Sequence, residues 1–141
     1  KGVRSVCGVI IITLQLYNPL MPTEVEKIIE IIKKHPKTVA IYIFGSFARG
    51  EEKPLSDVDI AVILKEPDRW DEADIGSLYS RNVDVVLFHR LPVYIQYEVL
   101  KYGKEIYVAD EEFLGEIRFR VIRDYLEHAR LYRFLEREIL K

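Results

Sequence analysis

The sequence predicts an α/β domain, because amphipathic helical segments alternate with apolar, β-branched runs that read as strands. The 141 residues are 49% hydrophobic and 31% charged, which is the composition of a globular domain with its own core. Proline and glycine residues fall between the segments and mark their ends. The single cysteine leaves no internal disulfide, which favours the reducing cytoplasm as the location.

The first half of the pattern contains one helix and two strands. Thr23 is expected to cap a helix that continues through Lys34, and Pro36 closes the segment. The β-branched and aromatic run Thr38–Phe44 predicts a buried strand. A second strand is expected over Asp57–Leu64, where acidic and apolar residues alternate before the run becomes fully apolar.

The connection between these strands begins with a turn of two small residues. Gly45 and Ser46 break the first strand and are expected to open a short helix through Ala48. Gly50–Ser56 is then a polar loop that contains a proline.

The second half continues the alternation. The pattern does not decide between helix and strand for Ala73–Tyr79, whereas Asn82–Phe88 is a third predicted strand. Pro92 fits the first turn of a helix that Gly103 stops. Glu105–Val108 is expected to be a short edge strand.

Asp110 is expected to cap a long final helix whose apolar face is wider than one small sheet needs. Two apolar lines follow its surface, through Leu114, Ile117, Val121, Tyr125, Tyr132, Leu135 and Ile139, and through Phe119, Ile122, Leu126 and Ala129. Either this surface packs on the core, or part of it faces a partner chain. In the second case the partner surface would contain Tyr125, Tyr132, Arg130 and Arg133, because Tyr and Arg are enriched at interfaces.

Three aspartates are the candidate metal ligands. Asp57 and Asp59 alternate with Val58 and Ile60, so both carboxylates are expected on one strand face while the apolar pair points into the core. Ionised carboxylates this close repel each other, and a hard cation such as Mg²⁺ relieves the repulsion. If the third strand pairs with the second, Asp84 adds a third carboxylate, and such a triad suits a two-metal displacement at phosphorus.

The turn before the acids suits a phosphate group. Gly45 allows close approach of the backbone, and Ser46 offers a hydroxyl and an N–H at the start of the expected helix. Arg49 either reaches a triphosphate or lies on the surface. A P-loop is excluded, because no Gly-Lys-Ser/Thr follows the turn. The alternative for the acids is a solvent-facing strand end, which would be preferred for one aspartate but not for three beside this turn.

These residues carry a family resemblance. The run Gly45–Gly50 followed by Ser56–Val62 resembles the signature of the DNA polymerase β-like nucleotidyltransferase superfamily. The likeness extends through Val83–Val86 and Leu91–Tyr107 and covers roughly residues 23–108. The short chain is similar to the minimal, MNT-type members, which are the antitoxin partners of HEPN-domain toxins.

The resemblance implies a small mixed sheet flanked by helices and an enzyme that uses ATP and two Mg²⁺ ions. The family's metal ligands match Asp57, Asp59 and Asp84, the last of which also helps to activate the acceptor hydroxyl. The family's triphosphate-binding pair matches Gly45 and Ser46. MNT antitoxins transfer AMP to a tyrosine of the HEPN toxin, a ribonuclease, and thereby silence it.

The resulting hypothesis is an adenylyltransferase that acts on a HEPN-domain toxin. The alternatives are an antitoxin that acts by binding alone, and nucleotidylation of a small molecule or RNA. A net charge of −2 gives no expectation of direct nucleic-acid binding, and no segment suits a membrane span. We expect an N-terminal extension or extra strand over residues 1–21, the nucleotidyltransferase core over 22–109, and over 110–141 a helix that packs on the core and on a partner.

Overall fold

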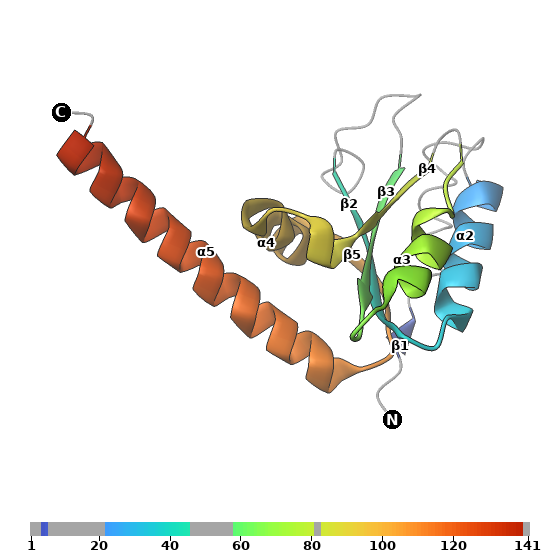
Figure 1. Ribbon diagram of the computed structural model, residues 1–141. Helices are drawn as coiled ribbons and strands as arrows, with labels where there is room; N and C mark the ends of the chain where they lie inside the picture. Colours follow the sequence, from blue (N-terminus) through green and yellow to red (C-terminus); the bar gives the residue numbers. More distant parts are fainter. Residues whose placement is uncertain (1–3, 6–21, 46–57, 81–82, 140–141) are drawn as a thin grey trace.

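The computed structural model describes residues 4–5, 22–45, 58–80 and 83–139 (Figure 1). Helices lie on both sides of one β-sheet, and a long C-terminal helix extends away from it. The elements, in chain order, are β1 (Arg4–Ser5), α2 (Pro22–Lys34), β2 (Thr38–Phe44), β3 (Val58–Leu64), α3 (Arg69–Gly76), β4 (Val83–Leu87), the 3₁₀ turn η1 (Phe88–Arg90), α4 (Val93–Tyr102), β5 (Lys104–Val108) and α5 (Glu111–Ile139).

The sheet is mixed, as the family resemblance implied, with the strand order β1-β5-β2-β3-β4. β2 lies antiparallel to both β3 and β5. β3 and β4 run parallel, and α3 lies in the connection between them. The second and third strands of the sequence pattern therefore pair, which is the condition on which the contribution of Asp84 depended.

Each face of the sheet has its own apolar core. On one face, alternate residues of β3 such as Val58 and Ile60 pack with α2 and α3, for example with Ile29 and Ile75. On the other face, residues of β2 and β3 pack with Val99 of α4 and with the first half of α5. Because strand residues alternate between faces, the buried apolar residues of β3 are divided between these two layers.

The segment that the sequence pattern left unassigned forms α3. Asp68 caps this helix: its Oδ1 accepts hydrogen bonds from the N–H groups of Trp70 (2.9 Å) and Asp71 (2.8 Å). The Asp71 carboxylate accepts in turn from the backbone N–H of Asp68, at 2.9 Å, which completes a capping box. The helix is only 8 residues long, so its apolar periodicity is too short to identify it.

The expectation of an edge strand near residue 105 is wrong. β5 pairs with β2 on one side and with β1 on the other, where Arg4 lies opposite Val108 and Ser5 opposite Tyr107. β1 lies within residues 1–21, where an extra strand was one of the two expected alternatives. Because a strand of 2 residues has no detectable period of its own, its bounds and its pairing with β5 could not be predicted.

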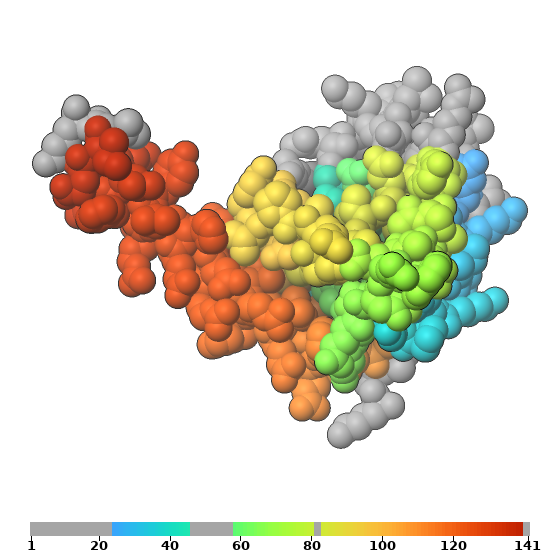
Figure 2. Space-filling view, in the orientation of Figure 1, coloured from blue at the N-terminus to red at the C-terminus, as the bar shows by residue number. Residues whose placement is uncertain are grey.

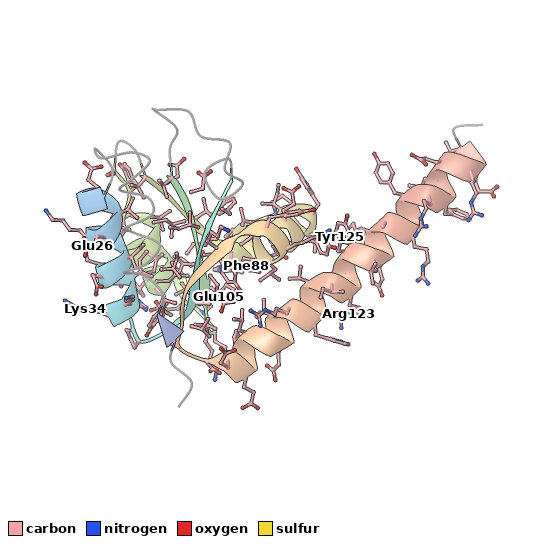
Figure 3. All side chains as sticks on the ribbon, turned by 180° about the vertical axis from the view of Figure 1, so that it is seen from behind. Glu26, Lys34, Phe88, Glu105, Arg123 and Tyr125 are labelled. Atoms are coloured by element: carbon pink, nitrogen blue, oxygen red, sulfur yellow. The ribbon has the colours of Figure 1, made fainter. Side chains whose placement is uncertain are left out.

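α5 begins as predicted, with the Asp110 carboxylate accepting a hydrogen bond from the N–H of Phe113 at 3.0 Å. Its first half packs on the domain, where Leu114 and Val121 are buried. Tyr125 stacks on Tyr97 of α4, with ring centroids 3.9 Å apart and planes 5° from parallel (Figure 3). Of the two alternatives left open for this helix face, the stack favours packing on the domain for Tyr125, because its ring lies against α4 of the same chain. None of the described helices has the length and apolar composition of a membrane span.

Replacing Leu114 with alanine is expected to lower the free energy of unfolding by about 2–5 kcal/mol, because this fully buried side chain fixes α5 to the sheet. Leu131→Ala, in the same helix but 56% exposed, is expected to change it by at most about 0.5 kcal/mol. Urea unfolding of the two variants measures both values. Equal losses would contradict the separation of α5 into a packed half and an exposed half.

Candidate active site

The candidate site lies at one end of the sheet, where β2 ends and where β3 and β4 begin. Phe44, the last residue of β2, is the register partner of Asp59 in β3. Asp59 in turn is the register partner of Asp84 in β4. Neighbouring strands lie about 4.8 Å apart, so this register brings the two aspartates side by side.

Both aspartates lie on the face of the sheet that α4 and α5 cover. Val58 and Ile60, on either side of Asp59, are fully buried in the core under α2 and α3. Val83 and Val85, on either side of Asp84, pack in that same core. Because side chains alternate along a strand, both carboxylates project to the opposite face. Asp59 is half-buried and Asp84 is exposed.

Gly45 follows β2 and lies against the Asp59 carboxylate. Its φ is +86°, in the left-handed region that favours glycine. A Cβ atom built on Gly45 would lie 2.5 Å from Oδ2 of Asp59. The backbone of the turn therefore approaches the carboxylate as closely as only a residue without a side chain allows.

The other predicted site residues, Ser46, Arg49 and Asp57, lie outside the described residues, as do the short helix expected through Ala48 and the loop Gly50–Ser56. Their roles stay predictions. Of the expected triad, the structure brings Asp59 and Asp84 together at the place where Gly45 ends β2.

The chemistry of this pair fits a divalent cation. Two carboxylates in register on adjacent strands supply hard oxygen ligands from one direction and repel each other without a cation between them. Asp84 is exposed, which leaves the pair accessible to a nucleotide whose phosphate oxygens would complete the coordination. Asp59 and Asp84 are thus the residues described here that would hold Mg²⁺.

A polar cluster on the same face of the sheet was not predicted. The Tyr42 hydroxyl donates to Oε2 of Glu105 at 2.9 Å, and the Arg118 guanidinium donates to the same Oε2 at 2.6 Å and to the Tyr42 hydroxyl at 3.2 Å. The cluster joins β2, β5 and α5, and Figure 3 marks Glu105 in it. The available signal was a tyrosine in the middle of an aliphatic strand, since a buried Tyr hydroxyl needs a partner.

Burial raises the pKa of Tyr42 to about 12. The hydrogen bond from Arg118 opposes this rise, while the Glu105 carboxylate adds to it by accepting the phenolic proton. Tyr42 is therefore a neutral hydrogen-bond donor that helps to hold α5 on the sheet.

Comparison with known proteins places this geometry in a family. Residues 26–112, more than half of the chain, match the model of the family described as polymerase beta, nucleotidyltransferase. A provisionally named protein adenylyltransferase of Methanocaldococcus jannaschii is 34% identical over 101 residues, which are 70% of this chain and 80% of that protein. The protein adenylyltransferase MntA of Shewanella oneidensis is 30% identical over 92 residues, 61% of this chain and 66% of the relative.

Solved structures share the fold. A toxin–antitoxin complex with AMP-PNP contains a chain with a TM-score of 0.60 and 21% identity, over 84% of this chain and 97% of that chain. A complex of the tri-AMPylated Shewanella oneidensis HEPN toxin with an MNT antitoxin matches with a TM-score of 0.56 and 21% identity, over 84% of this chain and 100% of that chain. At these identities the likeness is one of fold.

Gly45→Ala is expected to lower the free energy of unfolding by about 1–3 kcal/mol and to abolish nucleotidyl transfer, because the new methyl group strains the turn and displaces the Asp59 carboxylate. The measurements are urea unfolding and transfer of label from α-labelled ATP. Gly115→Ala in α5 is the matched control, because its added Cβ meets nothing within 4 Å. It should stabilise the helix by about 0.5–1 kcal/mol and keep activity. Full activity of the Gly45 variant would contradict the close packing.

Tyr42→Phe is expected to reduce the loss of stability at alkaline pH. Below the usual tyrosine pKa of about 10, Tyr42 is neutral in both states and its stabilising contribution is fully present. As pH rises from about 10 to about 12, the unfolded chain ionises first and that contribution is lost. Urea unfolding of both proteins across this window measures the difference. The idea fails if the two proteins lose stability in parallel.

Proposed function

Because the chain belongs to the polymerase β nucleotidyltransferase family and is a nucleotidyltransferase, we propose that it is a Mg²⁺-dependent protein adenylyltransferase. In this proposal it transfers AMP from ATP to a tyrosine hydroxyl of a HEPN-domain ribonuclease toxin in the cytoplasm and thereby acts as an antitoxin. The observation that carries the proposal is the parallel register that places Asp59 beside Asp84 at the end of β2.

The proposed reaction is an in-line displacement at the α-phosphorus of ATP. The acceptor oxygen forms a bond to that phosphorus, the bond to the bridging oxygen of the β-phosphate breaks, and pyrophosphate leaves with the bonding electron pair. Asp84 is exposed and lies beside the metal-binding Asp59, so it is suited to take the proton of the acceptor hydroxyl. Bound Mg²⁺ would supply charge neutralisation at the phosphates.

Three predicted residues complete the assignment. Asp57 would share the metal ions with Asp59, two residues further along the chain. The turn of Gly45 and Ser46 would hold the triphosphate, and Arg49 would add a positive charge to it.

The choice of a protein acceptor is supported by the names of the two curated relatives, which are both protein adenylyltransferases. The choice of a HEPN toxin is supported by the similar fold of an MNT antitoxin that was solved with an AMPylated HEPN toxin. ATP as the donor is supported by the AMP-PNP complex of a further chain with this fold.

A second candidate function is neutralisation by binding alone. The observation that favours it is the exposed apolar surface of the second half of α5, which includes Tyr132 and Ile139. Binding and transfer are compatible, because the exposed surface and the paired aspartates lie on different parts of the chain (Figure 1).

Asp59→Asn and Asp84→Asn are each expected to reduce AMP transfer by about 100-fold or more, because the amide keeps the size of the carboxylate but loses its charge for the metal. The assay incubates the full chain with α-labelled ATP, Mg²⁺ and a HEPN-domain toxin, and follows label on the toxin. Replacing the tyrosines of the toxin with phenylalanine one at a time identifies the acceptor.

Asp74→Asn is the matched control, because this exposed acid lies on α3, at the opposite face of the sheet, and should leave transfer unchanged. Transfer that persists in the Asp59 and Asp84 variants would refute the metal assignment. If both variants still suppress the toxin in cells although transfer is lost, binding accounts for neutralisation.

A further inference from the structure

The second half of α5 extends beyond the domain. The helix comprises 29 residues, Glu111–Ile139, and is therefore about 44 Å long. Its first half packs on the sheet and α4, whereas its C-terminal part projects away from both (Figures 1 and 2). We refer to residues 128–139 as the arm.

The apolar stripe that packs on the domain continues along the arm. From Val121 the stripe proceeds in alternating steps of four and three residues, which is the spacing of heptad a and d positions. Its apolar positions are Val121, Tyr125, Tyr132, Leu135 and Ile139, and His128 occupies the remaining position. Val121 is buried and Tyr125 stacks on α4, but Tyr132 is 70% exposed and Ile139 is 68% exposed. The same seam is thus covered by the domain at one end and uncovered at the other.

The uncovered seam has the dimensions of a contact for one helix. Tyr132, Leu135, Glu136 and Ile139 line a shallow hollow on its surface. Leu131 and Phe134, both half exposed or more, widen the apolar surface on one side.

The charged residues beside the seam indicate which charges a partner helix should carry next to its apolar stripe. In heptad terms Glu136 occupies an e position and Glu138 a g position, so acids flank the seam on both sides. Arg130 and Arg137 occupy f positions and Arg133 a b position, and together with Glu136 they line a second hollow on the outer side of the helix. A second copy of this chain would bring glutamates against glutamates, which is destabilising.

We propose that the arm docks a helix of the acceptor protein whose apolar stripe is flanked by lysine or arginine residues. The apolar contacts would come from Tyr132, Leu135 and Ile139, and the specificity from Glu136 and Glu138. The identification of the partner with the acceptor rests on the proposed function, whereas the surface itself rests on the helix alone. The docked acceptor would be held on the same side of the sheet as the carboxylates of Asp59 and Asp84.

The test measures binding in the absence of ATP and Mg²⁺, so that its outcome does not depend on catalysis. The probe is a fluorescent helical peptide of about three heptads with leucine at a and d and lysine at e and g. The full chain is expected to bind it, and to bind a matched peptide with glutamate at e and g at least about fivefold more weakly. Glu136→Lys/Glu138→Lys should reverse this preference, as measured by fluorescence anisotropy.

Two further variants separate the seam from the overall charge. Glu26→Lys/Glu30→Lys makes the same change of charge on α2, on the other side of the sheet, and should leave the preference unchanged. Leu135→Gln/Ile139→Gln keeps a good helix former at both positions and should weaken binding of the lysine peptide at least about fivefold. If the α2 variant reverses the preference as well, or if the seam variant binds normally, the proposal is overturned.

Sedimentation of the full chain tests whether a second copy of this chain, rather than an acceptor protein, covers the arm. A monomer is expected, and a dimer that Leu135→Gln/Ile139→Gln dissociates would overturn the proposal in favour of a second copy. Loss of AMP transfer in the Asp59 variant would support the proposed function, and intact peptide binding by the same variant would support the arm independently of catalysis. Normal transfer by Leu135→Gln/Ile139→Gln, with the toxin bound as tightly as by the unchanged chain, would refute the arm without affecting the proposed function.

Discussion

The register of β3 between its two neighbours is the constraint on which the site depends. β3 is bonded to β2 on one edge and to β4 on the other, and six of its seven residues are buried. A shift by one residue would turn Asp59 into the apolar layer under α2 and α3 and would expose Val58 or Ile60 on the other face. The free-energy cost of burying this carboxylate and exposing an apolar side chain therefore keeps Asp59 in its observed position. The hydrophobic effect in the two cores thus positions two carboxylates that repel each other when both are ionised.

The two faces of the sheet differ in the polar side chains that they carry. The face under α2 and α3 is a closed apolar layer, whereas the face under α4 and α5 carries Asp59 and the cluster of Tyr42, Glu105 and Arg118. α5 belongs to this second face through that cluster and through the Tyr97–Tyr125 stack. A helix held in this way extends beyond the domain without loosening its packed half.

The sequence predicted the elements whose pattern is long and regular. The β-branched runs identified β2, β3 and β4, and the resemblance to the family gave the mixed sheet that the structure shows. The prediction failed or stayed open where the decisive partner is remote in sequence. β1 covers the edge of β5 that was expected to be free, and only the contact with α4 decides that Tyr125 packs on the domain. α3 depends on a capping box rather than on periodicity. The pairing of Asp59 with Asp84 was predictable only as a consequence of strand pairing, and Asp57, Ser46 and Arg49 stay predictions.

Because α5 is one uninterrupted helix, the distance between its anchored part and its C-terminal tip is fixed. The helix has no proline, and its one glycine, Gly115, lies near its start. From Arg118, which Tyr42 and Glu105 anchor, to Ile139 the axis rises about 32 Å. A protein held at the tip must therefore bridge a fixed span before one of its hydroxyls reaches the carboxylates. The length of the helix would therefore select acceptor proteins by their size as well as by their surface. One added helical turn would move the tip by about 5.4 Å.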